Sequence, residues 1–300
     1  MCGRFALYYD REQLVRIAGS SGWLLEKEQE KRYCYRPRYN VAPQQTVPLV
    51  RLVAGKRVLQ PMRWAISIPG GYGVKNRTAL TVINVRAETA FDKVTFRRAL
   101  EAGHRAVVVA NGFYEWTSAD PAVQKGSAKV KLSSKTVRVP YFIFSRKSLD
   151  AEHASCVSAD AGEPGTTPLF MAAMFVEDTD MNRFAIFTVS ASPDLLWMHD
   201  RMPAILDTVE KLETWLDVDR VSARDAAERC LRPTDQVAWH AVSRAVSSVK
   251  NDDPSLVQLR PIESVDKSSV DIRQSFASVL KRSPSDQTIE RLCTQKTRSA

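Results

Sequence analysis

Four apolar runs rich in β-branched and aromatic residues constrain the fold of this chain more than any other feature. They read RAVVVANGFYEW, VPYFIF, LFMAAMFV and RFAIFTV, and all lie between residues 105 and 189. Such residues favour β-strands. Further strands are predicted for RFALYY, for ALTVINV, and for TVPLVRLV and RVLQPMRWAI on either side of an Ala54-Gly55 turn. Because these strands outnumber helices and do not alternate regularly with them, the pattern predicts an α+β domain of mostly antiparallel sheets.

A few helices are predicted beside these strands. Asp10 is a candidate N-cap for a helix that carries Leu14 and Ile17. VTFRRALEAG predicts a short helix that ends at Gly103. DTVEKLETWL and SARDAAERCL predict two more amphipathic helices.

The domain is predicted to span residues 2–263. Two polar segments, about 118–138 and about 146–167, are interpreted as insertions, and the Ser-, Lys- and Arg-rich tail 264–300 is predicted to be disordered. The chain has a net charge of +9, and the tail supplies +4 of it, from seven Lys/Arg and three Asp/Glu counted from Lys267 onward. A basic balance of this kind is typical of proteins that bind nucleic acid, but a merely soluble basic surface fits equally well.

The cysteines and the apolar runs indicate the compartment. The five cysteines are scattered without a C-x-x-C pair: Cys2, Cys34, Cys156, Cys230 and Cys293. This spacing argues against a disulfide framework and a zinc site, and no nucleotide-binding loop is present, so we expect neither a metal nor a cofactor. No run approaches the roughly 20 apolar residues that span a bilayer, and no signal-peptide pattern opens the chain. We therefore expect a protein of the nucleus or cytoplasm with no membrane partner.

Cys2 follows the initiator methionine directly. Methionine aminopeptidases generally remove Met1 when the next residue is small, which would leave an amine and a thiol on one residue. The amine can condense with an aldehyde to an imine, and the thiolate can then close a five-membered thiazolidine. Tethered nucleophiles of this kind reach effective molarities of about 10⁵ M or more. The alternative is an ordinary buried cysteine.

Three other stretches carry polar groups suited to chemistry. INVRAET places Asn84, Arg86 and Glu88 on one face of a predicted strand. Glu115 lies between two aromatic residues in NGFYEW, where a carboxylate suits proton transfer. His199 precedes a proline turn in HDRMPAIL and can act as an acid or a base. Each also has a plain structural interpretation, namely a solvated strand face, an exposed glutamate and a structural histidine.

Six motifs occur in a fixed order along the chain. They are MCGRF, RYNVAP, the pair Arg63-Trp64, NVRAET, NGFYEW and HDRMPAIL, and VKNDDPSLVQ follows them. In these motifs the chain closely resembles the SRAP family (SOS response-associated peptidase), the abasic-site processing proteins. The resemblance runs from Cys2 to about residue 260. It implies a single barrel-like SRAP domain with a few peripheral helices.

The resemblance also implies an activity and roles for residues. Family members bind single-stranded DNA that holds an abasic site, and their N-terminal cysteine forms a thiazolidine link with the aldehyde of the opened sugar. In this chain Cys2 would be the nucleophile, Asn84 would position its amine, Glu115 would shuttle protons, and His199 would assist ring opening and reversal. The implied DNA contacts are Arg4, Trp64, Arg86 and Arg201. Structural ion pairs are the alternative role for these arginines.

Further expectations follow from the same resemblance. The family name records a peptidase activity, which here would remove only Met1. An imine at an abasic site permits β-elimination, so weak lyase activity is a reasonable side reaction. A response to DNA damage, the replication machinery as a partner and a monomeric state complete the expectations.

One stretch departs from the family pattern. After Arg63-Trp64 the family usually continues Gly-Leu-x-Pro-x-Trp, whereas this chain reads AISIPGGY. Ala65 replaces the glycine, one residue is added, and Tyr72 is the aromatic residue that could replace the second tryptophan. The departure concerns the DNA contact near this loop and leaves the Cys2 chemistry untouched.

Two other functions compete with this one. Class II glutamine amidotransferases also begin with a cysteine, often followed by glycine, but they need an ammonia-accepting domain for which this chain has no room after residue 260. A noncatalytic single-strand-binding module would fit the basic charge and leave Asn84, Glu115 and His199 unexplained. An intact Met1 in the mature protein would favour this binding module.

Overall fold

The computed structural model describes residues 2–25, 33–68, 80–117, 138–146 and 165–260, which belong to one structural unit. Most of the two expected insertions and the whole expected tail 264–300 lie outside these residues. The domain limits 2–263 therefore stay a prediction. In the described residues, no helix has both the length and the apolar character needed to cross a bilayer.

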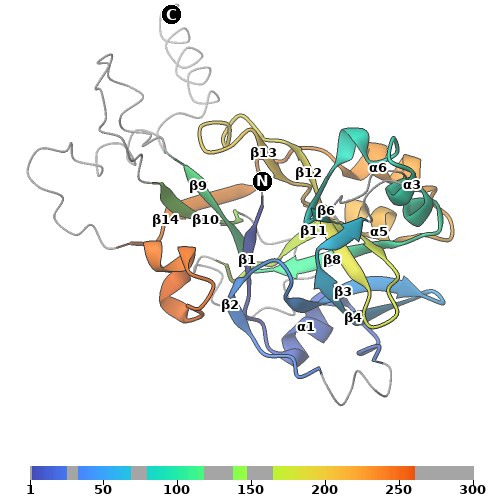
Figure 1. Ribbon diagram of the computed structural model, residues 1–300, viewed down its shortest axis with the longest axis horizontal. Helices are drawn as coiled ribbons and strands as arrows, with labels where there is room; N and C mark the ends of the chain where they lie inside the picture. Colours follow the sequence, from blue (N-terminus) through green and yellow to red (C-terminus); the bar gives the residue numbers. More distant parts are fainter. Residues whose placement is uncertain (1, 26–32, 69–79, 118–137, 147–164, 261–300) are drawn as a thin grey trace, which may run out of the picture. The chain divides into compact units, whose positions relative to one another are not determined.

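The first sheet holds the start of the chain in its interior (Figure 1). Its order is β14 (Val237–Ala241), β10 (Val139–Ser145), β9 (Gly112–Thr117), β1 (Arg4–Leu7) and β2 (Arg38–Val41). All four pairings are antiparallel, and β1 lies between β9 and β2. The residues that follow Cys2 are thus bonded to strands on both sides.

The second sheet closes on itself. Its order is β11 (Leu169–Val176), β8 (Arg105–Ala110), β3 (Thr46–Val53), β4 (Lys56–Trp64), β12 (Arg183–Ser190) and β13 (Arg201–Pro203). A further pairing joins β11 to β12, so five of these strands form a hydrogen-bonded ring. Among the pairings of the described strands, only those of β12 with β4 and with β7 (Asn84–Arg86) are parallel. The expected mostly antiparallel α+β domain is confirmed, and its second sheet contains a closed ring of strands.

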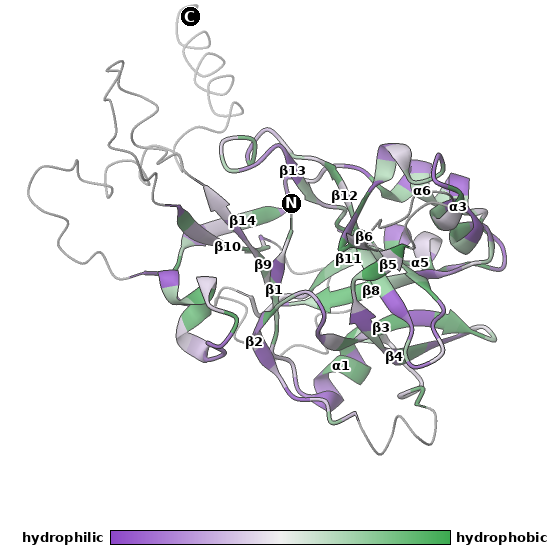
Figure 2. Ribbon diagram, in the orientation of Figure 1, coloured by the Kyte–Doolittle hydropathy of each residue, from purple (hydrophilic) through white to green (hydrophobic). Residues whose placement is uncertain are grey.

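The core fills the ring and the space between the sheets. Every residue of β8 is buried, and so is every residue of β11 except Val176. Figure 2 shows both strands as mostly apolar. A two-stranded ribbon of β5 (Ile66–Ile68) and β6 (Leu80–Val82) completes the strands that the structure describes.

Four helices and three short 3₁₀ turns complete the described elements. The helices are α1 (Arg11–Ala18), α3 (Val94–Glu101), α5 (Val209–Leu216) and α6 (Ala223–Cys230), and the turns are η1 (Ala87–Thr89), η2 (Arg244–Ser247) and η3 (Pro254–Val257). Asp10 caps α1 as expected, in a reciprocal capping box with Gln13. Helices α3, α5 and α6 gather on one side of the ring, away from α1 (Figure 1).

Three predicted strands are broken in the structure. RVLQPMRWAI divides at Ala65, between β4 and β5, and two others divide where a buried side chain contacts the backbone. RAVVVANGFYEW divides at Asn111, so that β8 belongs to the ring and β9 to the first sheet. The fully buried Asn111 accepts from the Tyr8 N–H at 2.7 Å and donates to the Gly165 carbonyl at 2.8 Å. ALTVINV divides at Ile83, whose carbonyl accepts from the Trp64 indole. In both places a buried side chain satisfies backbone groups where the strand is interrupted.

We predict that Gly112→Ala destabilises the domain. A Cβ at this position would come closer than 3.0 Å to the ring of Phe142 and to the Ile143 carbonyl oxygen. Overpacking of this kind costs roughly 1–3 kcal/mol of unfolding free energy. Urea denaturation of the single variant, of Phe142→Leu and of the double variant measures the effect. Because the shorter side chain relieves one of the two clashes, the two changes should be coupled, and strictly additive losses would contradict this packing.

Candidate functional site

Cys2 lies immediately before β1 and is only 1% exposed. Its thiol donates to the Arg4 carbonyl at 3.7 Å. Burial first, and then the negative charge of Glu115, raises the pKa of this thiol to about 12. With Met1 still in place, Cys2 is therefore a protonated thiol, and it needs a base before it can act as a nucleophile.

Asn84 holds the backbone of Cys2. It opens β7, where the parallel register with β12 places it opposite Ile186. Its side-chain amide donates to the Cys2 carbonyl at 2.8 Å. Its Oδ1 atom is buried and has no hydrogen-bond partner among the described residues. The site thus contains an unused acceptor beside Cys2, as positioning of an amine requires.

Glu115 reaches the same place from the first sheet. It lies on β9, the strand that pairs with β1, and opposite Tyr141 of β10. The side chain is partly buried, and its Oε1 accepts from the Trp116 N–H at 3.3 Å. Because its charge acts on the Cys2 thiol, the structure brings the predicted carboxylate and the predicted nucleophile together.

His199 lies just before β13, which pairs with β12 of the ring. Its Nδ1 is 2.9 Å from the backbone nitrogen of Arg201 and 2.7 Å from a carboxylate oxygen of Asp200. Strand β12 has β7 on one side and β13 on the other, so Asn84 and His199 belong to segments that flank one strand. The imidazole is held at Nδ1, and its side chain is 30% exposed.

Arg201 is engaged by the protein itself. Its two terminal nitrogens donate to the two carboxylate oxygens of Glu88, each at 2.8 Å, and one of them also donates to the Thr188 carbonyl at 2.5 Å. These bonds lower the pKa of Glu88. The ion pair is the alternative role left open above, and a phosphate role for Arg201 stays a prediction.

The face predicted for INVRAET is partly wrong. Strand β7 ends at Arg86, and Glu88 lies in η1 because the chain turns at Ala87. The alternation of polar residues in the sequence placed Glu88 on the same face as Asn84, but this pattern could not identify Arg201 as the ion-pair partner of Glu88. Arg86 is exposed at the end of β7, two residues after Asn84.

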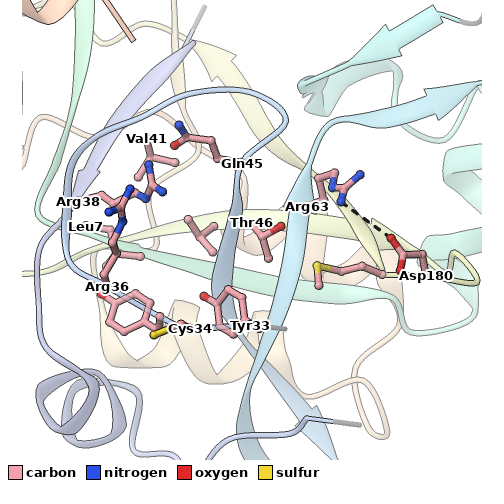
Figure 3. A pocket seen from close by; sticks show the side chains of 13 residues that line it. Leu7, Tyr33, Cys34, Arg36, Arg38, Val41, Gln45, Thr46, Arg63 and Asp180 are labelled. Atoms are coloured by element: carbon pink, nitrogen blue, oxygen red, sulfur yellow. Dashed lines mark ion pairs between the residues drawn. The ribbon is translucent and has the colours of Figure 1, made fainter. Parts of the chain in front are cut away.

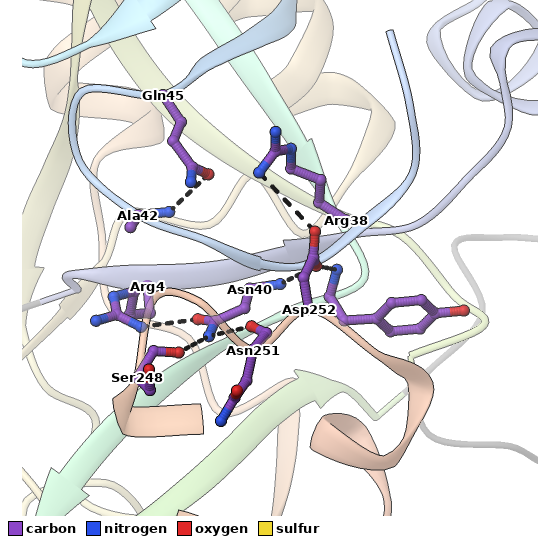
Figure 4. A network of polar contacts seen from close by, with 9 residues as sticks. Arg4, Arg38, Asn40, Ala42, Gln45, Ser248, Asn251 and Asp252 are labelled. Carbon is purple, nitrogen blue, oxygen red and sulfur yellow. Dashed lines mark hydrogen bonds and ion pairs between the residues drawn. The ribbon is translucent and has the colours of Figure 1, made fainter. Parts of the chain in front are cut away.

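Arg4 takes part in a second polar network, drawn in Figure 4. Its guanidinium donates to Asn40 Oδ1 at 2.8 Å, to the Val246 carbonyl at 2.9 Å and to the Ser247 carbonyl at 3.3 Å. These partners are all parts of the protein, so Arg4 fastens residues 246–247 beside Cys2. Its expected contact with DNA stays a prediction.

Asn40 is the centre of this network and was missed as a functional residue. It is 1% exposed, and its amide nitrogen lies 2.9–3.1 Å from three carbonyl oxygens, those of Val246, Ser248 and Asn251. The backbone N–H groups of Tyr39 and Asn40 donate in turn to Asp252. The one available signal was a polar residue within the apolar part of RYNVAP. We call residues 243–253 the closing segment, since they close over β1 and β2.

The expected DNA contact of Trp64 is corrected by the structure. This side chain is 0% exposed, its ring lies 5.1 Å from that of Phe5, and its indole N–H donates to the Ile83 carbonyl at 2.9 Å. It is therefore a core residue and not a stacking platform for bases. Tyr72, named as a substitute aromatic, lies outside the described residues.

The described residues hold no group of three or more His, Cys, Asp or Glu side chains that could bind a metal ion. The residues that the structure places at Cys2 offer a thiol, an amide and a carboxylate, and the His199 imidazole lies beside β13, which pairs with the same strand as β7. Such a set can move protons around an N-terminal nucleophile.

Comparison with known proteins finds relatives that match most of the chain. A family model described as SOS response associated peptidase (SRAP) matches residues 1–249. The chain is 32% identical over 284 residues to the abasic site processing protein HMCES of Gallus gallus, covering 88% of this chain and 78% of that protein. It is 31% identical over 270 residues to YedK of Escherichia coli, also named an abasic site processing protein, covering 86% and 99%.

A solved structure agrees with the fold. A protein of Bacteroides thetaiotaomicron superposes with a TM-score of 0.59 at 20% identity, covering 87% of this chain and 100% of that one. At this identity the likeness concerns the fold alone.

We predict that Asn40→Ala loosens the closing segment. The change removes the amide donor from the carbonyls of Ser248 and Asn251, leaves Arg4 as the donor to the Val246 carbonyl, and removes the acceptor of one Arg4 N–H. Unmet buried groups should lower the unfolding free energy by roughly 2–4 kcal/mol. Hydrogen exchange should rise in residues 243–253 before the rest of the domain. Asn251→Ala is the matched control, because its side chain makes only the bond to the Ala245 carbonyl among those described. Equal protection in both variants would mean that Asn40 is not the clamp.

Proposed function

The chain belongs to the SRAP family, and from this premise we propose that it recognises abasic sites in single-stranded DNA and, once Met1 is removed, links to them covalently through Cys2. The observation that carries the proposal is the meeting of three residues at the start of the chain. Asn84 bonds to the Cys2 backbone, and the charge of Glu115 acts on its thiol. The names of the relatives supply the substrate class.

The linkage needs two bond-forming steps. The Cys2 amine adds to the aldehyde carbon of the opened sugar, and the resulting hydroxyl leaves as water to give an imine. The thiol sulfur then bonds to the imine carbon, and the thiol proton passes to the nitrogen. One water molecule is released overall, and no oxidant or reductant is needed.

The environment of Cys2 suits this order of events. Cys2 is buried beside a carboxylate, which favours the protonated thiol with Met1 in place. We infer that in the mature protein the amine reacts first and the thiol proton is retained for ring closure. Glu115 can accept that proton and return it to the nitrogen. The unused Oδ1 of Asn84 is the acceptor that we assign to the amine.

The remaining assignments rest on placement. We assign His199 to proton transfer at the sugar ring oxygen, on opening and on reversal. Arg86 is exposed beside Asn84, and we assign it to a phosphate that flanks the lesion. Arg4 and Arg201 keep their assignment to phosphates as well, with part of each guanidinium used by the protein.

Finer activities are also part of the proposal. Peptidase activity would remove Met1, and the imine opens a route to β-elimination and hence to weak lyase activity. A role with the replication machinery, a monomeric state and a nuclear or cytoplasmic location stay predictions.

We predict a heat-stable adduct between the mature protein and a single strand that carries one abasic site. Cys2→Ser keeps the amine but cannot close a thiazolidine, so it should give a labile imine that borohydride traps. Denaturing gels with and without borohydride, and the mass of the N-terminal peptide, measure both species. A serine variant whose adduct is as stable as that of the wild type would rule out the thiazolidine.

We predict separable effects for Glu115→Gln and His199→Ala. Loss of the carboxylate should slow adduct formation even on an aldehyde that is already open, whereas loss of the imidazole should mainly slow ring opening and reversal. A general acid–base group contributes about 10²–10⁴ in rate. Formation is followed on gels, and reversal by transfer of protein from the adduct to excess competitor strand. If either variant keeps the wild-type rate in its assigned step, that assignment is wrong.

A further inference from the structure

An open cavity of about 460 Å³ lies between the first sheet and the ring, apart from the residues assigned above. Figure 3 shows Arg36 and Arg38 on one side and Arg63 on the opposite side. Leu7 of β1 and Thr46 of β3 line it as well. The cavity therefore combines three guanidinium groups, two of them from strands of different sheets.

The charge of this cavity is only partly compensated. Arg63 lies 3.9 Å from Asp180, and Arg38 lies 3.8 Å from Asp252. Arg36 is exposed and forms no ion pair with any described carboxylate. Partly exposed pairs at such distances contribute about 0–1 kcal/mol, so an anionic ligand could take over both paired arginines at little cost.

Neutral donors complete the lining. The Tyr33 hydroxyl is buried and has no hydrogen-bond partner among the described residues. Gln45 uses its side-chain oxygen to accept from the Ala42 N–H, which leaves its amide nitrogen as a donor. A phosphate group offers acceptors for these donors, and arginine binds it bidentately.

The cavity is connected to the site at Cys2 through β1. Leu7 pairs with Arg38 and lies five residues beyond Cys2, which is roughly 17 Å along an extended strand. At the helical rise of about 3.4 Å per nucleotide this corresponds to about five nucleotides, and to fewer in a more extended strand. A DNA strand held at Cys2 is thus long enough to reach the arginines.

We propose that this cavity binds a backbone phosphate of the same DNA strand, a few nucleotides away from the abasic site. The inference rests on the proposed function and extends it by a second anchoring point. It predicts that strands which reach the cavity bind more tightly than strands which end before it.

The test uses the full chain and two series of oligonucleotides that carry one abasic site. In one series the unmodified tract on the 5′ side of the lesion lengthens from about two to about twelve nucleotides, and in the other series the tract on the 3′ side does. Affinity is measured by fluorescence anisotropy at several salt concentrations, on lesion-bearing and undamaged strands. The variant Arg36→Gln/Arg38→Gln/Arg63→Gln is compared with Arg16→Gln/Arg220→Gln/Arg229→Gln. The control removes the same charge, and its exposed arginines are each paired with a carboxylate outside the cavity.

We expect the affinity of the wild type and of the control to rise in a step once the tract on one side passes about five nucleotides. The cavity variant should lack this step, and its salt slope should fall by about 0.7 for each phosphate that it no longer neutralises. Arg36→Gln alone should show part of the effect. Arg36 is exposed and forms no ion pair with a described carboxylate, so this single variant should keep the stability of the wild type. It therefore keeps the test valid if the triple variant unfolds at a lower temperature. A step that persists in both cavity variants would overturn the proposal.

Two further outcomes separate this inference from its premise. If no adduct forms but the step on undamaged strands depends on the cavity arginines, the cross-linking function fails and the phosphate site stands. If inorganic phosphate alone raises the melting temperature of the wild type but not of the cavity variant, and no length step exists, the ligand is free phosphate and the DNA assignment is wrong.

Discussion

The pairing of β1 on both of its edges is the interaction on which the rest of the site depends. An N-terminal residue is ordinarily among the most mobile parts of a domain. Here β1 is bonded to β9 and to β2, so Cys2 enters the core instead of fraying. The same register places Glu115 on the neighbouring strand, and Asn84 of the ring bonds to the Cys2 backbone. The start of the chain thus acquires the fixed geometry that the proposed chemistry requires.

Arginine serves two physical purposes in this domain. Arg105 is 2% exposed and donates to the carbonyls of Asp217, Val221 and Ser222, and Arg4 does the same for the closing segment. Both act as multivalent donors that gather backbone oxygens which no strand satisfies. Arg36 and Arg86 instead remain exposed. All four side chains carry the same positive charge, and the two groups differ in how deeply the protein buries them.

The strands and helices followed from local patterns, because apolar runs, an N-cap and a turn dipeptide act over a few residues. The errors arose where residues distant in the sequence determine the end of a strand or the burial of a side chain. Asn111 interrupts a long apolar run because Tyr8 and Gly165 need its amide. Trp64 looks like a nucleic-acid platform in a basic chain, but Phe5 and Phe184 enclose it. Asn40 carried a weak local signal because its partners lie more than two hundred residues away. For Cys2, Asn84 and Glu115 the order of motifs was sufficient to name them together as candidates, and the structure places them near one another, whereas their roles remain proposals.

The clamp between Asn40 and the closing segment also sets an order of events during synthesis. Strand β1 finds its partner β9 only after residue 117 has been made, and the clamp needs residues 246–252. At about 5–20 residues per second, the start of the chain stays unpaired with β9 for roughly 6–23 s and unclamped for roughly 10–50 s. Met1 is open to an aminopeptidase throughout this interval, whereas Cys2 of the finished domain is 1% exposed. The late closure of the fold therefore leaves time for processing on the ribosome, before the thiol is enclosed.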